Sequence, residues 1–573
     1  IFIITQNLVL AWSYPKARTE PIVMSVNINL LIKLFILCIT LCGSIFVSTD
    51  LFMDVQNTPK QLFGEIGVSL FVFYYACSIL LKQDRTKNDK FYFYAIFCFS
   101  IIATIEATYG ITSFIANWMS NHKMEPTCGS FNNPAGLAVL LSSVYPYLLY
   151  LLQVTKGKNR LYTYIAIAII FIAISMSASR SGILCIISVS LLYILYRKRI
   201  SLKKIAIISI IPISLLIYAL YTINRNSANG RLFIWARSFE LIKERKFLGY
   251  GTDAFKANYM THQANYFESN PESAYSMIAD NVQYPYNEWI DLLLNYGLSG
   301  LFLLLTCIIC IIICYRKNNS TIKKYAAMSC FSIVVFSLFS YPFFYTCTWI
   351  VLGFNLYLII GSLYWMFDFF LEKLHLKYIF AFCIMTFTIV FFHNRVSYIN
   401  TELKWKRAHT LYINTKSHNT LIEYQKLYDR MRKNPFFLFN YANVLYDQGK
   451  YDDSNIIAEQ TKTLWKNYYI ELLLGDIEDK RNNPYKAIEH YIIASNMCPA
   501  KFHPLVQIQQ LYRNIGDTVS ANEFATRIIN KPIKIKSHKI ELIKELMKHE
   551  LKESRLHRTG HSKQTDKNSL TRH

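Results

Sequence analysis

Charged residues are scarce in this chain. Only 17% of its 573 residues are Asp, Glu, Lys or Arg, against about 25% in an ordinary soluble domain. Hydrophobic residues make up 53% and aromatic residues 15%, although the last third is visibly polar. This composition excludes a disordered chain and a simple cytosolic protein, because neither carries so much apolar surface. It predicts a membrane protein with several spans.

The usual nucleotide and zinc motifs are missing as well. The sequence has no Walker-type loop, no dinucleotide fingerprint and no HExxH. Cys307, Cys310 and Cys314 share one helix face within an apolar run, which we interpret as packing rather than metal binding. We therefore expect no metal ion and no cofactor. The net charge of +24 is compatible with anionic lipids or phosphorylated substrates, and we expect no nucleic-acid partner.

Apolar runs of about 20 residues, long enough to cross a bilayer, occur about eleven times. The fold class we predict is all-α: a polytopic transmembrane helix bundle with a long periplasmic loop and a C-terminal soluble domain of helical repeats. The predicted spans are 29–48, 62–82, 91–115, 134–153, 161–179, 182–197, 203–222, 297–315, 325–343, 347–367 and 378–394.

Basic residues gather in alternate short loops, for example Arg197 to Lys204 and Arg316 to Lys324. The positive-inside rule makes these loops cytoplasmic. The N-terminus is then cytoplasmic, and the long segment 223–296 and everything after about 395 lie on the far side of the membrane. The first residues are apolar but too short to span, and no cleavage site follows, so we expect no cleaved signal peptide. Met24 is an alternative start.

The predicted domain organisation has six parts. They are an N-terminal segment 1–28, spans one to seven at 29–222, the long periplasmic loop 223–296, spans eight to eleven at 297–394, helical repeats at 395–535 and a basic tail at 536–573.

A period of 34 residues marks the polar C-terminal third. Tyr451, Tyr485 and Val519 recur at this spacing, each after a turn-like segment. A helix-turn-helix period of this length resembles the tetratricopeptide repeat. About three repeats are predicted over 436–532, and stacked helix pairs of this kind offer a surface for a protein partner.

Polar features cluster on the predicted outer face. Span five ends in ASRSG, which holds Arg180, and the long loop opens with GRLFIW, which holds Arg231 and Trp235. Arginine at a membrane boundary is costly unless it is paired or hydrated. Arg180 alone is readily explained by snorkelling to lipid headgroups. Glu65 and Glu106 lie in or near spans two and three, where either carboxylate would neutralise Arg180.

An ordered set of motifs resembles the superfamily of O-antigen ligases and O-antigen polymerases. The matching stretches are GSFNNPAGLA at 129–138, SRSG at 179–182, GRLFIW at 230–235, GYG at 249–251 and YNEWIDLLLNYGLSG at 286–300, and the resemblance covers about residues 60–365. It implies a periplasm-facing enzyme that moves a glycan from a polyprenyl diphosphate carrier to an acceptor, with inversion and without a metal ion.

Residue roles follow from the resemblance and from the chemistry. Arg180 and Arg231 are expected to clamp the diphosphate, because a guanidinium group matches phosphate oxygens and stays protonated. The ligases of this superfamily commonly place His before the Asn at the end of the loop, whereas this chain has Tyr286 before Asn287. The role of base then falls to Glu288, with His262 and Asp280 as outside candidates.

Simpler explanations stand beside these roles. Glu288 also suits the first turn of a helix as a favourable acid. Asn132 and Asn133 precede Pro134, a typical helix start, but their amides also suit donor or sugar contacts, as do Asn287 and Trp235. The candidate catalytic residues are thus Arg180, Arg231, Glu288 and Tyr286; the candidate substrate-binding residues are Asn132, Asn133, Asn287 and Trp235.

Three acceptors remain open. Lipid A core would define an O-antigen ligase and is favoured, another lipid-linked chain would define a polymerase, and Ser or Thr of a protein would define an O-oligosaccharyltransferase. Two other functions are less economical. A flippase for lipid-linked sugars would show internal span repeats, and a scaffold for the repeats would need only one span.

Overall fold

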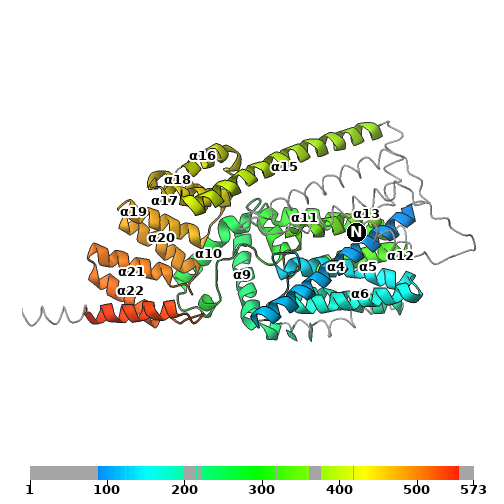
Figure 1. Ribbon diagram of the computed structural model, residues 1–573, viewed down its shortest axis with the longest axis horizontal. Coiled ribbons are helices and arrows are strands. Elements are labelled where there is room, and N and C mark those ends of the chain that lie inside the picture. The colour runs from blue at the N-terminus through cyan, green and yellow to red at the C-terminus, as the bar shows by residue number, and fades with distance from the viewer. Residues whose placement is uncertain are drawn as a thin grey trace, which may run out of the picture. The chain divides into compact units, whose positions relative to one another are not determined.

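The computed structural model of the chain describes residues 88–122, 124–198, 214–215, 218–219, 221–316, 320–360, 376–416 and 419–553. Every regular element in these ranges is a helix (Figure 1), which confirms the predicted all-α class. The chain divides into two compact units. Of the described residues, the membrane unit holds those up to 223, 286–289 and 302–403, and the loop–repeat unit holds 224–285, 290–301 and those from 404 to 553.

Helix α5 (Pro134–Val154) is the centre of the membrane unit. Its apolar window is 89% buried, because five other helices pack around it. The Asn133 side chain caps its first turn by accepting a hydrogen bond from Ala135 N, and Pro134 occupies the first helical position. The surrounding helices are α4 (Asn88–Asn121), α6 (Gly157–Met176), α7 (Arg180–Arg197), α12 (Thr321–Ser337) and α13 (Thr346–Ile360).

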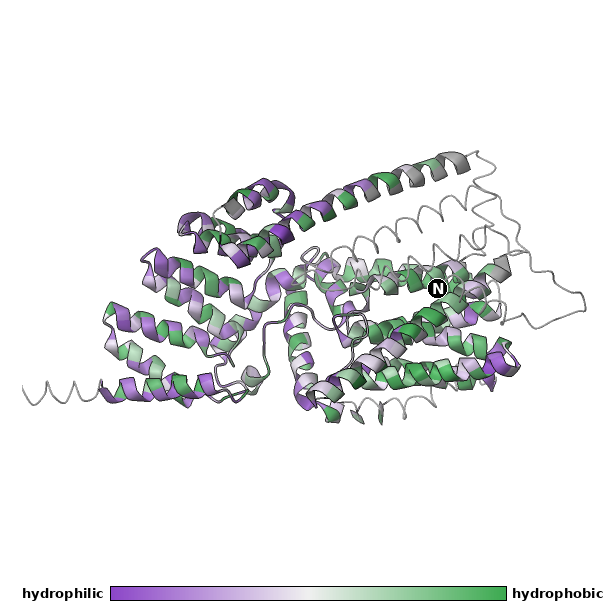
Figure 2. Ribbon diagram, in the orientation of Figure 1, coloured by the Kyte–Doolittle hydropathy of each residue, from purple (hydrophilic) through white to green (hydrophobic). Residues whose placement is uncertain are grey.

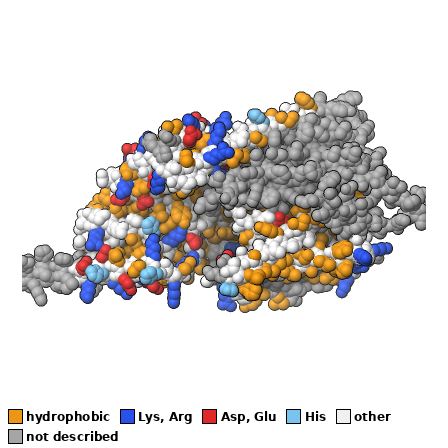
Figure 3. Space-filling view, in the orientation of Figure 1, with side chains coloured by type: hydrophobic (Ala, Val, Ile, Leu, Met, Phe, Trp, Pro, Cys, Tyr) orange, Lys and Arg blue, Asp and Glu red, His pale blue; other side chains and the backbone are white. Residues whose placement is uncertain are grey.

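The outer helices of this unit expose apolar side chains. On α6, Leu161 is 57% and Ile172 47% exposed, and on α11 (Glu288–Arg316) Phe302 is 73% exposed. Figure 2 shows α4, α5 and α6 as predominantly hydrophobic, and Figure 3 shows hydrophobic side chains spread over the visible face of this unit. So much exposed apolar surface is expected where lipid replaces water.

Five helices in the described ranges are long and apolar enough to cross a membrane. They are Phe91–Ser120, Pro134–Val154, Gly157–Met176, Arg180–Arg197 and Glu288–Arg316. They match the predicted spans at 91–115, 134–153, 161–179, 182–197 and 297–315, which confirms a multi-pass membrane protein. The runs 325–343, 347–367 and 378–394 fall on α12, on α13 and on α15 (Leu376–Thr415), partly outside the described residues. Spans 29–48 and 62–82, most of 203–222, residues 1–28, Glu65 and the end of the tail lie outside them altogether.

Buried polar side chains connect the helices of the bundle. Ser329 on α12 donates to the Ser143 carbonyl of α5 at 2.6 Å and accepts from Asn355 on α13 at 2.9 Å. Tyr147 on α5 donates to the other end of the Asn355 amide. In a lipid environment such bonds fix the register between helices, because an unpaired polar group there is costly.

The predicted loop is largely helical where it belongs to the loop–repeat unit. It forms α9 (Arg225–Glu244), α10 (Ala254–Ser269) and the short 3₁₀ helix η3 (Ala274–Met277). Phe233 on α9 packs on Phe267 of α10, with ring centroids 5.4 Å apart. Arg237 lies over the Tyr266 ring at 4.4 Å and pairs with Glu240 at 2.8 Å. The two helices thus form a packed pair.

Two glycines join the end of α9 to the start of α11. Gly249 has a φ of +68°, and a Cβ there would meet the Asn295 carbonyl oxygen at 2.5 Å. Gly297 has a φ of +61° and kinks α11. Four backbone bonds connect 246–251 with 294–299, among them Tyr250 N to Leu294 O at 2.8 Å and Leu298 N to Lys246 O at 2.7 Å. Glycine is required because the two backbones touch. Helix α11 starts at Glu288, before the predicted span start at 297, and residue 297 is instead the position of its kink.

The repeats form a stack of helix pairs. The first helices, α17 (Pro435–Asp447), α19 (Tyr468–Lys480) and α21 (His503–Ile515), begin at intervals of 33 and 35 residues. The second helices are α18 (Tyr451–Leu464), α20 (Pro484–Met497) and α22 (Thr518–Asn530), and α16 (Asn419–Met431) precedes the stack. Tyr451, Tyr485 and Val519 lie at the starts of the second helices, so the predicted 34-residue repeat is confirmed as a helix pair.

Candidate functional site

A loop between α12 and α13 connects two candidate segments within the membrane unit. Asn133 Nδ2 donates to the Tyr341 hydroxyl at 2.9 Å. The Tyr341 ring packs against Tyr286, with centroids 5.7 Å apart, and stacks on Tyr345 at 6.0 Å. Tyr341 therefore links the start of α5 to the segment 286–289, although Asn133 and Tyr341 are 208 residues apart in sequence.

The segment 286–289 has an unusual backbone. Tyr286 adopts a positive φ of 54°, which is uncommon for a residue with a bulky side chain. Asn287 accepts from Trp289 N at 2.9 Å and donates to the Leu338 carbonyl at 3.0 Å. Glu288 begins α11, and its Oε1 accepts from Phe343 N at 3.1 Å. The predicted trio is thus held against residues 337–345, with the three side chains half-buried.

Sequence reasoning missed the loop at 337–345. Besides these contacts, Ser337 Oγ accepts from the indole of Trp289 at 3.0 Å. The run SYPFFY is aromatic and lies in what the sequence predicts as the end of one span and the start of the next. Its Pro342 was the available signal, because proline marks a helix break.

Glu106 organises the segment before α5. Its two carboxylate oxygens accept from Ser130 N at 3.2 Å and from Ser130 Oγ at 2.9 Å. Thr127 donates to the Gly110 carbonyl at 2.7 Å, and Thr127 N donates to the Met176 carbonyl at 3.2 Å. Glu106 therefore holds this turn, in which the Asn132 side chain is exposed. Neutralisation of Arg180 by Glu106 stays a prediction.

Arg180 is the first residue of α7. Ser179 caps this helix by accepting from Gly182 N, and Ala178 before it has a φ of +50°. A Cβ on Gly182 would lie 2.9 Å from the Ala138 Cβ, so the start of α7 lies against the start of α5. Arg180 is half-buried there. The N-termini of α5 and α7 meet at this end of the membrane unit, and the positive ends of their dipoles favour a negative charge.

Arg231 and Trp235 belong to the loop–repeat unit. They lie four residues apart on α9 and so share one helix face. The Trp235 indole donates to the Pro285 carbonyl at 2.8 Å. This bond fixes α9 to the residue that immediately precedes Tyr286 in the chain. The joint action of Arg180 and Arg231 on one diphosphate stays a prediction.

The outside candidates for the base have other contacts. His262 Nε2 lies 3.0 Å from Glu240 Oε2, on the face of α9 that packs on α10. Glu240 is nine residues from Arg231 along α9, and at 100° per residue the two side chains lie on opposite faces of the helix. Asp280 lies 3.6 Å from Lys534 and 4.0 Å from Lys501. Within the described ranges, no group of three or more His, Cys, Asp and Glu side chains is placed to share a metal ion.

Comparison with known proteins addresses the part of the chain that holds most of these residues. A family model described as O-antigen ligase matches residues 165–305. This stretch is similar to the O-antigen ligase family. The match includes Arg180, Arg231, Trp235 and the segment 286–289, whereas Asn132 and Asn133 precede it. The resemblance drawn from the sequence motifs is thereby confirmed, and the ligase-like domain includes α7, α9, α10 and the first part of α11.

Other comparisons add little. No curated protein sequence matches the chain. Among solved structures, the crystal structure of the yeast Tom70 is similar at 10% sequence identity, with a TM-score of 0.26, over 89% of this chain and 100% of that one. A similarity at this level supports no statement about fold or function.

Proposed function

We propose that this protein is a membrane glycosyltransferase that moves a glycan from a polyprenyl diphosphate carrier to an acceptor at the periplasmic face. The match of residues 165–305 to the O-antigen ligase family carries this proposal. The family model and the candidate residues coincide in α7, in α9 and at the start of α11. The bacterial inner membrane, the periplasmic C-terminal domain and the inverting, metal-independent reaction belong to the same proposal.

The leaving group sets the first chemical demand. When the glycosyl bond breaks, the carrier departs as a lipid diphosphate, and the negative charge on the departing oxygen grows. Arg180 and Arg231 would hold this diphosphate, because guanidinium groups bind phosphate oxygens in pairs and remain charged. Each contact would stabilise the transition state by about 3 kcal/mol, as preorganised donors to a developing anion do. The N-termini at α5 and α7 favour the same charge.

The acceptor sets the second demand. Inversion by a single displacement needs a base that takes the proton from the attacking hydroxyl. Glu288 is our candidate: Oε1 accepts the Phe343 amide, which orients the carboxylate, and we assign the proton to Oε2. Tyr286 would contact the acceptor or the sugar ring. Asn133 and Asn287 use both ends of their amides within the protein, so we assign them to positioning and Asn132 to sugar contact.

The acceptor itself is open within this proposal. Lipid A core is favoured, which would make the protein an O-antigen ligase. A second lipid-linked glycan or a protein hydroxyl would make it a polymerase or a protein O-oligosaccharyltransferase, and the repeats would suit a protein partner in either case. Deletion of the gene distinguishes the three, because lipopolysaccharide ladders, polymer length or glycoproteins would change respectively. Transport of a lipid-linked sugar remains the more distant alternative.

The proposal is tested by replacing Arg231. The full chain, reconstituted in vesicles with a lipid-linked oligosaccharide and lipid A core, is compared with Arg231→Ala and with Arg225→Ala. Arg225 lies on the same helix, but its side chain is exposed at the first turn. We expect Arg231→Ala to lower the transfer rate at least about 100-fold, as the loss of about 3 kcal/mol implies, and Arg225→Ala to transfer at the wild-type rate. Normal transfer by correctly inserted Arg231→Ala would refute the clamp.

A further inference from the structure

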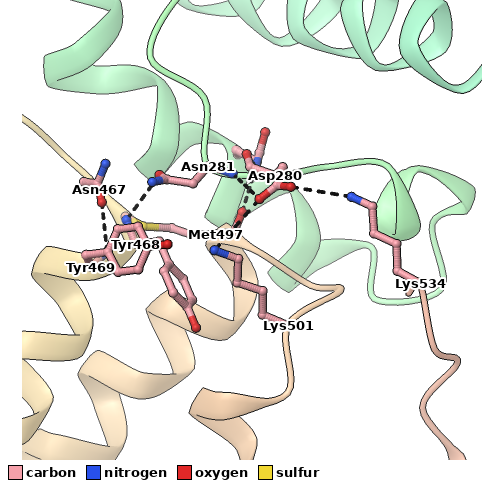
Figure 4. A network of polar contacts seen from close by, with 9 residues as sticks. Asp280, Asn281, Asn467, Tyr468, Tyr469, Met497, Lys501 and Lys534 are labelled. Carbon is pink, nitrogen blue, oxygen red and sulfur yellow. Dashed lines mark hydrogen bonds and ion pairs between the residues drawn. The ribbon is translucent and has the colours of Figure 1, made fainter. Parts of the chain in front are cut away.

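The loop segment and the repeats contact each other inside the loop–repeat unit. Helix α10 packs against α18 and α20, the second helices of two successive pairs. Backbone contacts accompany this packing: Lys466 N donates to the Lys256 carbonyl at 3.0 Å, and Tyr468 N donates to the Asn281 side chain at 3.4 Å. Figure 4 shows the segment around Asp280 and Asn281 lying against Tyr468, Met497 and Lys501 of the repeats.

Gln263 is at the centre of these contacts. Its side chain is only 1% exposed, although glutamine is usually found at the surface. The amide nitrogen donates to two carbonyls, that of Met497 at 2.7 Å and that of Asp280 at 3.1 Å. Met497 is the last residue of α20, where carbonyls have no partner within the helix. One buried amide thus connects a helix of the repeats, α10 and the segment that leads to Pro285.

This connection continues to α9. The segment 279–285 ends at Pro285, whose carbonyl accepts from the Trp235 indole. On the other side of the pair, Phe267 of α10 packs on Phe233. The position of α9, and of Arg231 on it, is therefore fixed by two elements, α10 and the segment 279–285, and Gln263 bonds one to the other and to the repeats.

We infer that the repeats hold the loop in place within this chain, a contact that we call the repeat clamp to distinguish it from the diphosphate clamp of Arg180 and Arg231. Gln263 is the residue that positions α9 through Asp280 and α10. The repeat clamp concerns the structure of this chain alone, whereas its effect on glycan transfer rests on the proposed function. A protein partner would then bind a repeat stack that already holds the loop, and its binding would alter the position of α9.

The charged contacts around the clamp are weaker. Asp280 pairs with Lys534 and Lys501 at 3.6 and 4.0 Å, but its side chain is 56% exposed, so water screens both pairs. The buried amide is different, because replacing it leaves two carbonyls without a donor in a site closed to water. This contrast supplies a matched control, in which Gln263→Leu should release the loop and Lys534→Ala should not.

Hydrogen exchange of the full chain in lipid nanodiscs tests the clamp without any substrate. In Gln263→Leu we expect backbone amides in 228–244 and 279–285 to exchange about tenfold faster or more, since about 1.4 kcal/mol or more of local stability is lost. Amides in α17 should keep their protection, and Lys534→Ala should change exchange by less than about twofold. Unchanged exchange at 228–244 and 279–285 in a folded Gln263→Leu chain would overturn the inference.

A second variant covers the case in which Gln263→Leu fails to fold. Asn281→Ala removes the acceptor for Tyr468 N from the other side of the contact. We expect faster exchange confined to 279–285 and α9, and unchanged exchange there would count against the clamp.

Transfer assays separate positioning from general destabilisation. If Gln263 acts through Arg231, then Gln263→Leu should lower the rate less in an Arg231→Lys background than in the wild type. An equal factor in both backgrounds would contradict positioning through Arg231. Normal transfer by Arg231→Ala would refute only the diphosphate contact of Arg231. Absence of transfer by the wild-type chain would refute the proposed function, and neither outcome would change the exchange result.

Discussion

Replacing Glu288 by Gln separates the two roles that its position allows. Glu288 is the first residue of α11, and its Oε1 accepts from Phe343 N at 3.1 Å. Gln keeps a carbonyl oxygen of similar geometry and so retains this hydrogen bond and the start of the helix. It removes the carboxylate that would take the acceptor proton. The substitution therefore changes the chemistry and keeps the contact with Phe343 N.

The size of the effect follows from the role of a general base. Such a base contributes about 100-fold to 10,000-fold to the rate, which corresponds to about 3–5 kcal/mol of barrier. We expect Glu288→Gln to lose transfer activity by a factor in this range, with wild-type hydrogen exchange at 286–289 and 337–345. Glu288→Ala should lose activity and also exchange faster at 337–345, because Phe343 N then has no acceptor at this site.

The assay is single-turnover transfer from a fluorescent lipid-linked oligosaccharide by reconstituted protein. Saturating donor isolates the chemical step from donor binding. A Glu288→Gln rate within about threefold of the wild type would refute the role of base. Glu288 would then have a structural role, as the first acid of α11 and as an acceptor for the Phe343 amide.

Three further predictions concern the loop–repeat unit. Gly249→Ala should destabilise the contact between 246–251 and 294–299 by about 2–4 kcal/mol, because a Cβ would meet backbone at 2.5 Å and φ is +68°. Hydrogen exchange should rise there, but it should rise less in Gly251→Ala, where φ is +93° and nothing lies within 4 Å of the added Cβ. Equal effects of the two substitutions would contradict the clash. Burial lowers the pKa of Lys531 to about 8, so the charged form is penalised in the fold and repeat stability should rise between about pH 8 and pH 10.5. Lys531→Met should stabilise the repeats at pH 7 by about 1–2 kcal/mol, from about 3 for the buried charge less about 1 for the hydrogen bond to the Lys501 carbonyl and up to about 1 for the contact with the Phe502 ring. No gain in exchange protection at 503–530 would count against this. Burial alone would raise the pKa of Glu471, but the hydrogen bond from His490 and the Lys462 ammonium outweigh it and lower the pKa. The ionised Glu471 therefore stabilises the repeats above about pH 4.5, and this stabilisation is lost as the pH falls through the lowered pKa. Glu471→Gln should remove this acid sensitivity of hydrogen exchange in 451–497.

The membrane helices and the repeats were predictable because each follows from a local pattern. Length and hydropathy identify α4, α5, α6, α7 and the part of α11 that follows its kink at Gly297, since a span needs about 20 apolar residues. The turn segments before Tyr451, Tyr485 and Val519 identify the second helices of the repeats. Both signals lie within a single element and its neighbours, and neither needs knowledge of distant contacts.

The contacts that build the candidate site were not predictable in this way. Asn133 and Tyr341 meet although they are 208 residues apart, and Gln263 and Met497 are 234 residues apart. The glycines at 249 and 297 were visible in GYG and NYGLSG, but a single sequence does not reveal that the backbone at Gly249 touches Asn295 and that at Gly297 touches Phe247. The sequence therefore indicated which residues are chemically suited to the site, whereas packing of distant segments decides which of them meet.

Glu106 illustrates the difference. An acid in a predicted span suggests a partner of opposite charge, because a lone carboxylate in lipid is costly. The structure satisfies this carboxylate with the amide and hydroxyl of Ser130, which belong to the GSFNNPAGLA segment. Neutral donors on Ser130 thus contact a carboxylate for which the sequence suggested an arginine partner, and neutralisation of Arg180 by Glu106 stays a prediction.

Binding of the carrier lipid tests the central claim most directly. The dissociation constant of a fluorescent polyprenyl diphosphate is measured for the full chain in nanodiscs, in the wild type, Arg180→Ala, Arg231→Ala and Arg225→Ala. The account predicts that Arg180→Ala and Arg231→Ala each weaken binding about tenfold or more, since a charge-assisted hydrogen bond contributes about 1.5–3 kcal/mol, while Arg225→Ala binds as the wild type does. Wild-type affinity in either Arg180→Ala or Arg231→Ala would contradict the clamp on the diphosphate.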